Sequence, residues 1–511
     1  MVRRVPIALV VLVCAALLSV APGARTARAA DRFTFFGSGW GHGLGLSQWG
    51  AYGLAQEGWG RDRILTHFYS GTRVVHDGSA PAALRIGLVQ GRQKLTFTAL
   101  RGPVDLRLGD RQPGSTLATI PRGETWTVTQ VGGAYRILDG SGTRVADGVG
   151  GTATDLFAVY EPKGAMVKVP QAGHTYNRGW IELNIANCDA RCSMRLILTI
   201  APQPYLYGLA EVPSSWPRPA LQAQAIAART YAFRKVALSG QHRPGCNCAL
   251  YASSLDQVYA GYDKEGGDMG ERWVAAVNAT DGRVVTYKGD LIQAFYTSSS
   301  GGYTENNENV WGGPPIPYLR GVCDPGDFTP ANPNAVWKVQ MGAAQVTERL
   351  HLGIGRVTGF GNTVRGVSGR IVSIVVKGTN GRATIGGGTL RAALGLQDDR
   401  VWINRNRQVT GSIRQKYDAI GCRPGLPTSR RVGVAGGERQ VFQRGTIYAK
   451  DGTGAHALSG PILAYYGKHG GPGGPLGFPV SDTIRLQNGN TRTRFEHGTV
   501  TCRPSGSCWR S

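Results

Sequence analysis

Short alternations of apolar and polar residues dominate the first half of the chain. Between residues 84 and 169, runs such as Leu-Arg-Ile-Gly-Leu at 84–88 are separated by Gly, Asp and Pro. A period of two is typical of half-buried β-strands bounded by turns. The pattern predicts a β-rich subdomain over about 84–170 and two further strands near 180–185 and 194–200.

One alanine-rich stretch, over 218–236, has the composition and length of a long helix. Residues that commonly begin helices precede it: Ser214, Ser215 and Pro217. A shorter stretch over 61–69 places its apolar residues at helical spacing. Helices and short strands mixed in this way predict an α+β fold with a long Ala-rich helix, many short strands and a β-rich inserted subdomain.

The chain is expected to divide into a main domain and a small C-terminal unit. The main domain covers 31–422, and the prolines and glycine that follow it predict a linker over 423–435. Residues 436–511 are rich in Gly, aromatic residues and turns, which predicts a small β- and turn-rich unit. A mature chain of about 480 residues exceeds one ordinary hydrophobic core.

The N-terminus has the layout of a secretory signal peptide over 1–30. Arg3 and Arg4 are followed by an apolar run over 7–20, and small residues surround the expected cleavage site near Ala30. The run is shorter than the roughly 20 apolar residues that a membrane-spanning helix needs. We therefore expect a secreted protein, extracellular or associated with the cell wall.

The net charge of +24 is spread along the chain rather than gathered in tails. Diffuse positive charge on an exported protein is suited to an anionic cell wall or membrane surface. Nucleic acid is not expected as a partner, because export and scattered charge both argue against it.

Eight cysteines follow the leader, and an even count in an oxidising compartment predicts disulfides. Cys188 with Cys192 and Cys502 with Cys508 are spaced for local loops.

Cys246 and Cys248 are separated by one residue. A ring between them would be strained, so each is expected to pair elsewhere. The alternative is a zinc site formed by His242, Cys246 and Cys248; apart from this, no cofactor is expected.

Glycine occupies every second position of a first candidate segment, Gly-Trp-Gly-His-Gly-Leu-Gly at 39–45. In a strand, this spacing would let a ligand or another backbone approach closely. His42, Ser47 and Gln48 are the polar residues available for hydrogen bonds, and a purely structural turn is the alternative. A phosphate loop is a weak interpretation because no lysine follows.

Glu211 defines a second candidate segment. It lies among apolar residues, with Val212, Pro213 and Trp216 following it. Such surroundings raise the pKa of a carboxyl, as a general acid requires. The alternative is an ordinary carboxylate at a helix start.

Arg229 lies on the predicted helix with apolar neighbours at helical spacing. An arginine on such a face needs an anionic partner or a wet cleft. Either Glu211 or an anionic substrate could meet that need, and substrate is the preferred expectation.

A third candidate segment, over 294–305, combines hydroxyl side chains with paired glycines. Sugar binding is the expected role of its polar side chains: Tyr296, Ser299, Ser300 and Thr304. Trp311 and Tyr318 follow as candidate stacking platforms.

Together, the three segments resemble the sporulation stage II protein D / LytB (SpoIID/LytB) family, over about 33–421. The resemblance implies that Glu211 is catalytic and that the 295–302 segment lines the same cleft. Sporulation members are lytic transglycosylases that cut peptidoglycan glycan strands stripped of peptides. The Gly-His-Gly segment lies near the C-terminal end of the domain in those members, so the order here resembles a circular permutation that must bring His42 back to the site.

The expected function is peptidoglycan cleavage between MurNAc and GlcNAc with one catalytic carboxyl. Asp256 is the best second carboxylate, although a structural role is favoured for it. With one carboxyl, the sugar's own C6 hydroxyl attacks and leaves 1,6-anhydroMurNAc ends. The family also contains amidase enhancers, so the alternatives are a non-catalytic enhancer, which would have a wall amidase as partner, and a wall-binding scaffold.

The C-terminal unit carries Leu-Gly-Phe-Pro at 476–479, and its 495–500 segment echoes 442–447. It resembles the LGFP repeats of wall-associated actinobacterial proteins, which implies wall binding. An inert stabilising cap is the alternative.

Overall fold

A computed structural model describes residues 31–160, 164–189 and 191–511. The predicted signal peptide, 1–30, lies outside these residues. Eleven α-helices and several β-sheets form in the described part, which confirms the α+β class. None of its helices is both long enough and apolar enough to cross a membrane.

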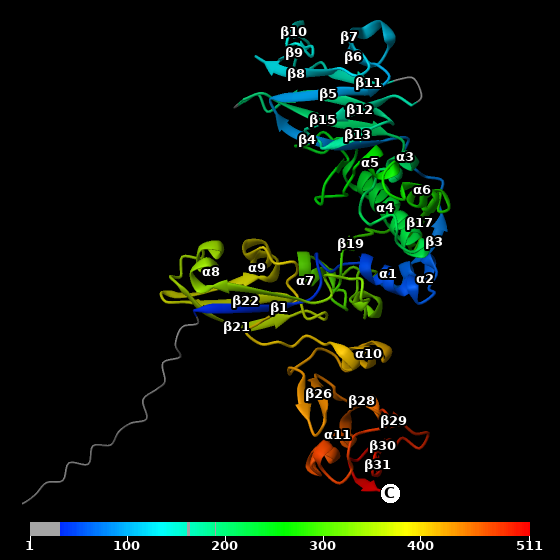
Figure 1. The fold of residues 1–511 in the computed structure, drawn as a ribbon, viewed down its shortest axis with the longest axis vertical. Helices are drawn as coiled ribbons and strands as arrows, with labels where there is room; N and C mark the ends of the chain where they lie inside the picture. The colour runs from blue at the N-terminus through cyan, green and yellow to red at the C-terminus, as the bar shows by residue number, and fades with distance from the viewer. Residues whose placement is uncertain (1–30, 161–163, 190) are drawn as a thin grey trace, which may run out of the picture.

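Two sheets make up the predicted β-rich subdomain, which lies at the top of Figure 1. Their strands are β4 (Leu84–Arg92), β5 (Lys94–Arg101), β6 (Val104–Leu108), β7 (Thr116–Ile120), β8 (Thr125–Val131), β9 (Ala134–Leu138), β10 (Arg144–Val149), β11 (Leu156–Val159), β12 (Met166–Val169), β13 (His174–Tyr176), β14 (Trp180–Ala186), β15 (Ser193–Ile200) and β16 (Leu250–Tyr251). One sheet has the order β16-β4-β15-β14-β11-β6-β7, and the other has the order β10-β9-β8-β5-β12-β13. The sheets share one hydrophobic core, because alternate apolar side chains of both face inward.

Helices form a layer beside these sheets and extend the same core. They are α1 (Gln48–Gln56), α2 (Arg61–Phe68), α3 (Pro202–Tyr207), α4 (Arg218–Ser239), α5 (Tyr262–Glu265) and α6 (Gly270–Asn278). The predicted long helix is confirmed as α4, which contacts α1, α2 and α6. Its alanines are small, so these neighbours approach closely on several sides. A small sheet of β3 (Arg73–His76), β17 (Arg283–Tyr287) and β18 (Asp290–Leu291) adjoins the layer.

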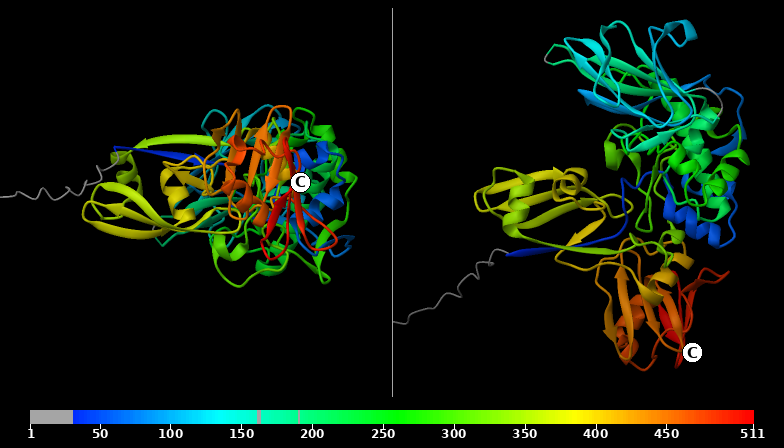
Figure 2. Two further views of the ribbon diagram at one scale, coloured as in Figure 1. Left: turned by 90° about the horizontal axis from the view of Figure 1, so that it is seen from below. Right: turned by 45° about the horizontal axis from the view of Figure 1, so that its top comes forward.

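A second lobe is built around the first strand of the described chain. Its elements are β1 (Arg32–Gly37), β20 (Trp337–Gly342), α8 (Ala343–Leu350), β21 (Val357–Arg365), β22 (Ile371–Gly378), β23 (Gly381–Gly386), α9 (Gly387–Leu394) and β24 (Val401–Ile403). β1 lies between β20 and β24, antiparallel to both. This lobe projects to one side in all views of Figures 1 and 2. Because β1 is fixed there, the glycine segment that follows it is held where the two lobes meet.

The C-terminal unit contains two similar hairpins with two helices. Its elements are α10 (Gly411–Ala419), β25 (Val432–Val434), β26 (Gly437–Phe442), β27 (Gly445–Lys450), β28 (Gly454–Leu458), α11 (Gly460–Lys468), β29 (Ile484–Arg485), β30 (Thr491–Phe495), β31 (Gly498–Cys502) and β32 (Cys508–Arg510). The β26–β27 and β30–β31 hairpins turn at the two segments that echo each other in sequence. Leu476 and Phe478 of the Leu-Gly-Phe-Pro run are buried in the core of this unit.

Part of the segment expected to be a linker, 423–435, belongs to the C-terminal unit. Strand β25 lies within it and pairs with β26. Ile413 and Tyr417 of α10 pack with Phe442 and Ile447. The packing of the C-terminal unit therefore starts before residue 423.

Four disulfides form in the described chain. The two local pairs are confirmed: Cys188–Cys192 and Cys502–Cys508. The expectation that Cys246 and Cys248 pair elsewhere is wrong, because they bond to each other. Asn247 between them adopts a left-handed conformation with φ 53°, and the two Cα atoms lie 5.2 Å apart, within disulfide range.

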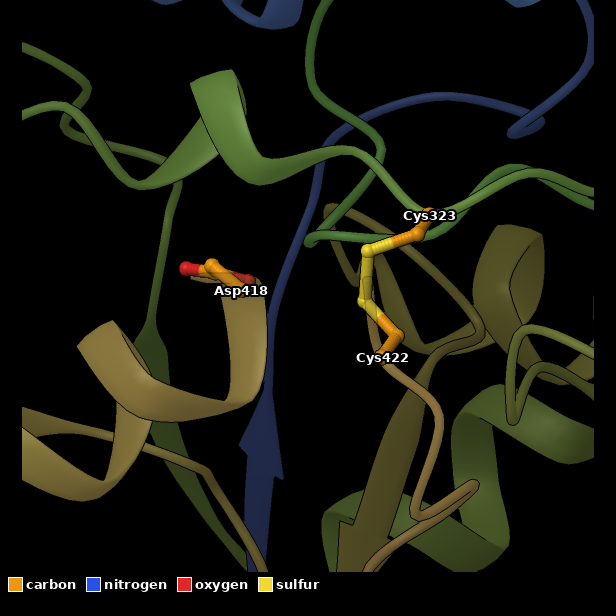
Figure 3. Close-up of side chains that lie close together, drawn as sticks. All are labelled: Cys323, Asp418 and Cys422. Carbon is orange, nitrogen blue, oxygen red and sulfur yellow. A yellow bond between two sulfur atoms is a disulfide. The ribbon is translucent and has the colours of Figure 1, made fainter. Parts of the chain in front are cut away.

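The fourth disulfide, Cys323–Cys422, joins positions 99 residues apart. It ties the main domain to the segment that leads into β25. Figure 3 shows this bond with Asp418 of α10 close by.

Candidate functional site

A cavity of about 600 Å³ lies where the three candidate segments meet. This volume is in the range of sites that hold small molecules or a few sugar units. Its lining comes from the glycine segment, the turn before α4, α4 itself, the 254–258 loop, the 295–298 segment, α7 (Asn307–Trp311) and α9. Of the predicted catalytic and polar binding residues, four line it: His42, Gln48, Glu211 and Tyr296; the predicted platform Trp311 and the second carboxylate Asp256 line it too.

The glycine segment is an irregular loop, and within it only the two residues of β2 (Leu46–Ser47) form a strand. Gly41 and Gly45 have φ angles of 128° and 67°, which favour glycine. A Cβ on Gly41 would lie 1.9 Å from Oγ1 of Thr297, and one on Gly45 would lie 2.1 Å from the carbonyl oxygen of Phe295. The glycines therefore let this loop approach the third segment, where β2 pairs in parallel with β19 (Tyr296–Thr297).

Glu211 lies in the turn between α3 and α4 and is half-buried. Its Oε1 accepts the backbone N–H of Val258 at 2.7 Å and the hydroxyl of Tyr296 at 2.9 Å. Burial raises the pKa of Glu211, while the hydrogen bonds from Val258, Tyr296 and Gln48 partly oppose the rise. The carboxyl therefore keeps its proton to a higher pH than an exposed glutamate does.

A buried chain of hydrogen bonds holds Tyr296 in place. Tyr205 donates to Oε1 of Gln257 at 3.0 Å, and Nε2 of Gln257 donates to the Tyr296 hydroxyl at 3.0 Å. Burial raises the pKa of Tyr296 well above its usual value. The phenol therefore stays protonated and serves as a donor to Glu211.

His42 is a neutral ring in this cavity. Its Nδ1 accepts the backbone N–H of Leu44 at 3.0 Å, which leaves the ring proton on Nε2. Burial, together with the charges of Arg370 and Arg391, lowers the pKa of His42 to about 3. His42 is consequently unsuited to accept a proton during catalysis.

Asp256 also lines the cavity, but its carboxylate is fully engaged. Oδ1 contacts Nζ of Lys235 at 3.0 Å and accepts the hydroxyl of Tyr231 at 2.9 Å. Oδ2 accepts Arg243 at 2.6 Å and the backbone N–H of Tyr251 at 2.9 Å. These contacts outweigh burial and lower the pKa of Asp256, so it is ionised and held in place.

Two exposed tryptophans flank the cavity. Trp40 and Trp311 expose 49% and 54% of their surface, and the Trp311 ring lies 5.0 Å from that of His42. Exposed aromatic side chains beside a polar cavity are suited to packing against sugar rings. Tyr318, the other predicted platform, is buried, and its hydroxyl accepts the N–H of Gln293.

Arg229 does not reach the cavity, contrary to expectation. Its guanidinium is buried and donates to the carbonyl oxygens of Thr280 and Arg283 and to Oε1 of Gln203. Neutral oxygen atoms thus accept hydrogen bonds from the Arg229 guanidinium. The apolar neighbours of Arg229 on the helix did not predict these partners. Burial lowers the pKa of Arg229 to about 10.

The serines predicted to bind sugar are buried beneath the cavity instead. Ser47 caps α1 by accepting the N–H of Gly50, and its hydroxyl donates to Asp327 at 3.2 Å. Ser299 donates to Asp327 at 2.9 Å, and Ser300 donates to Asp324 at 2.6 Å. These hydroxyls solvate a buried pair of carboxyl groups and join the first segment to the third.

Thr304 is likewise internal. Its hydroxyl accepts the N–H of Val322 at 2.8 Å.

The alternative zinc site is not formed. Cys246 and Cys248 are joined in a disulfide, and Nδ1 of His242 lies 2.7 Å from Oδ1 of Asn247. A thiolate is needed to bind zinc, and sulfur in a disulfide offers none. The same argument applies to the cluster of Cys323, Cys422 and Asp418 in Figure 3.

Sequence reasoning missed three contributors to the cavity. Lys235 lies on α4 beyond Arg229, and Arg391 lies on α9 of the second lobe. Trp40 was within the glycine segment but was not identified as a platform. A basic partner for Asp256 could have been predicted among the residues of the long helix, which include Lys235. No local sequence pattern indicated Arg391.

Comparison with known proteins agrees with the sequence resemblance. The family model described as Stage II sporulation protein matches residues 191–287, and the LGFP repeat model matches 425–474. The chain thus contains a stage II sporulation protein segment and an LGFP repeat, which confirms the resemblance.

Three relatives are similar over parts of the chain. The amidase enhancer of Bacillus subtilis (strain 168) is 36% identical over 143 residues, which are 28% of this chain and 17% of that protein. Stage II sporulation protein D of the same organism is 27% identical over 245 residues, which are 45% of this chain and 68% of that protein. The protein of that name from Bacillus amyloliquefaciens is 32% identical over 146 residues, 27% of this chain and 42% of that protein. These relatives support a role related to the cell wall.

Proposed function

We propose that this protein is a lytic transglycosylase of peptidoglycan in which Glu211 acts first as acid and then as base. The observation that carries the proposal is the state of this carboxyl. Val258 and Tyr296 both donate to Oε1, Gln48 is a further hydrogen-bond partner, and burial favours the protonated form. The carboxyl is therefore expected to carry its proton in a cavity large enough for sugar units.

The reaction would begin with proton transfer from Glu211 to the glycosidic oxygen between MurNAc and GlcNAc. As this bond breaks, the C6 hydroxyl of the same MurNAc attacks C1, and the ionised Glu211 accepts the hydroxyl proton. The products are a GlcNAc end with a free hydroxyl and a 1,6-anhydroMurNAc end. Hydrogen bonds from Val258 and Tyr296 stabilise the carboxylate between the two transfers.

The engagement of Asp256 supports chemistry with one carboxyl. Hydrolytic glycosidases commonly use two carboxyl groups, one of them as nucleophile or base. Glu211 and Asp256 are the carboxyl groups among the residues that line this cavity. Both oxygens of Asp256 are occupied by Lys235, Arg243, Tyr231 and Tyr251, so it is poorly placed to attack a sugar or activate water.

Substrate binding is assigned to the exposed rings and polar groups of the cavity. Trp40 and Trp311 would pack against sugar faces, and Gln48 would hydrogen-bond the substrate beside Glu211. Lys235 and Arg391 supply positive charge for the lactyl carboxylate of MurNAc. Export through a signal peptide and wall binding by the LGFP unit would place this activity at the cell wall.

The test is glycan cleavage by the Glu211→Gln variant. The amide keeps the shape of the side chain but cannot donate the acid proton. We expect purified glycan strands to be bound but not cut, with an unchanged melting temperature. Wild-type turnover by this variant would contradict the role of Glu211.

The second candidate is a non-catalytic enhancer of a wall amidase, which is favoured by the relative of that name. An enhancer would use the same cavity to hold glycan while the amidase acts. It would leave purified strands intact, and Glu211→Gln would stimulate a wall amidase as well as the wild type does.

A further inference from the structure

We propose that a second cavity, separate from that of Glu211, binds the anionic group of an acidic wall saccharide. This cavity has a volume of about 620 Å³. The second lobe, Tyr303, Asn309 of α7 and the beginning of the C-terminal unit build it together. We call it the arginine cavity, after its three arginines: Arg365, Arg407 and Arg444.

The charge of this cavity is positive. All of its lining residues belong to the described part of the chain, and none of them is acidic. Arg365 donates to the carbonyl oxygen of Val401, and Arg444 donates to that of Arg423, so neither has a carboxylate as its hydrogen-bond partner. Burial and the charges of Arg400 and Arg407 lower the pKa of Arg365 to about 10.

Arg407 is the arginine most available to a ligand. Within the described ranges, its guanidinium makes no hydrogen bond or ion pair, although the side chain is half-buried. A guanidinium offers five donors in a planar fork that matches a carboxylate or phosphate. An anion bound between these arginines would accept hydrogen bonds from guanidinium N–H groups that have no acceptor in the protein.

Aromatic and amide side chains beside the arginines suit a sugar more than a bare ion. Tyr303 is half-buried and offers an accessible ring, whereas Trp402 and Tyr417 are buried in the wall, where Trp402 lies 5.0 Å from the guanidinium of Arg365. Asn309 and Gln443 add amide groups for hydrogen bonds. Aromatic, amide and arginine side chains together are typical of sites that bind a sugar ring and its acidic substituent.

The cavity is held in shape by the Cys323–Cys422 disulfide, since Cys422 is part of the lining. Arg444 comes from the β26–β27 turn. The similar turn between β30 and β31 carries Glu496 and His497 at the corresponding positions, so the positive charge is particular to the first hairpin.

The position of the cavity suits a polymer that also reaches Glu211. A smaller cavity shares His42 and Trp311 with the Glu211 cavity. It shares Asn309 with the arginine cavity. A glycan strand bound at Glu211 could therefore place one of its more distant acidic sugars in the arginine cavity.

The test is calorimetric binding to the full mature chain at low salt, with three probes. N-acetylmuramic acid carries a carboxylate, N-acetylglucosamine 1-phosphate carries a phosphate, and N-acetylglucosamine is neutral. We expect at least one acidic probe to bind more tightly than the neutral one and to weaken as salt is raised. Preference for the carboxylate would identify peptide-free glycan as the source, and preference for the phosphate would identify a phosphate-bearing polysaccharide.

Two matched variants locate the binding. Arg407→Met should weaken binding of the preferred probe by about tenfold, because one bidentate charge-assisted contact is lost. Arg405→Met, on the same loop but exposed and outside the cavity, removes the same charge and should bind as the wild type does. Melting temperatures of both variants should match the wild type.

Equal affinity of the Arg407→Met and Arg405→Met variants, or equal binding of the neutral and acidic probes, would overturn the proposal. Glu211→Gln should leave the Arg407-dependent affinity unchanged. Failure of this proposal is thus distinguishable from failure of the proposed glycan cleavage.

Discussion

The hydroxyl of Tyr296 donates to Oε1 of Glu211 across 2.9 Å, from a position 85 residues further along the chain. The bond joins the second and third candidate segments at the centre of the cavity. It stabilises the ionised carboxyl, whereas burial favours the protonated form. The balance of the two effects sets the pH range in which Glu211 can donate and then accept a proton.

Replacing Tyr296 with Phe removes one donor to the carboxylate. The pKa of Glu211 should rise further, since the ionised form loses a hydrogen bond that the protonated form does not need. We expect the basic limb of the cleavage pH profile to move to higher pH and maximal turnover to fall by about tenfold. Tyr207→Phe removes a hydroxyl that bonds Asn278 outside the cavity, and its profile should match the wild type. Identical profiles for both variants would contradict the role of Tyr296.

Replacing Arg229 with Met should destabilise the fold without a specific effect on catalysis. Four buried or part-buried acceptors, on Thr280, Arg283, Val277 and Gln203, would lose their donor, at a cost of about 3 kcal/mol in the free energy of unfolding. Denaturant unfolding measures the loss, and cleavage per folded molecule should stay near the wild-type value. The exposed Arg218 on the same helix provides the control, because Arg218→Met should be close to neutral. A stable but inactive Arg229→Met variant would restore the substrate-binding role.

The buried carboxyl groups of Asp324 and Asp327 should make stability depend on pH. Burial and the charge of Asp327 raise the pKa of Asp324 to about 8. A group whose pKa is higher in the folded state stabilises the fold at low pH, and this contribution is lost as pH rises towards the folded value. Between about pH 4 and pH 8, Asp324→Asn should therefore flatten the fall in melting temperature with pH. A steeper fall in the variant than in the wild type would contradict this assignment.

Removing either exposed tryptophan should weaken glycan binding. Trp311→Ala and Trp40→Ala are each expected to lower the affinity for a glycan fragment by about tenfold, because a stacking surface is lost. Trp509 is also exposed but belongs to β32, so Trp509→Ala is the matched control for binding at this cavity. The tryptophan changes are made in the Glu211→Gln variant, so that the glycan fragment is not cleaved while its binding is titrated. Unchanged affinity in the Trp40 and Trp311 variants would place the sugar elsewhere.

Much of the fold followed from local patterns in the sequence. The helix α4 and the strands β14 and β15 were predicted because apolar periodicity and helix-start residues are local signals. The sequence left the conformation of the glycine segment open, because alternate glycines suit a strand as well as a loop whose backbone passes close to Thr297. Thr297 is 256 residues away from Gly41 in sequence.

The site was only partly predictable for the same reason. Glu211, His42, Gln48 and Tyr296 were found because their segments carry distinctive residue types. Arg229 and the serines do not line the cavity, because sequence does not reveal which buried carbonyl or carboxylate will meet a polar side chain. The Cys246–Cys248 pair was missed because its closure depends on the left-handed conformation of one asparagine.

The most direct measurement of the central claim is digestion of purified glycan strands in oxygen-18-labelled water, followed by mass spectrometry of the ends. If the sugar's own C6 hydroxyl attacks, the wild-type protein produces 1,6-anhydroMurNAc ends that contain no oxygen-18. The Glu211→Gln variant should produce no 1,6-anhydroMurNAc ends. Reducing MurNAc ends that carry oxygen-18 would show that water attacks instead. That result would contradict the one-carboxyl mechanism assigned to Glu211.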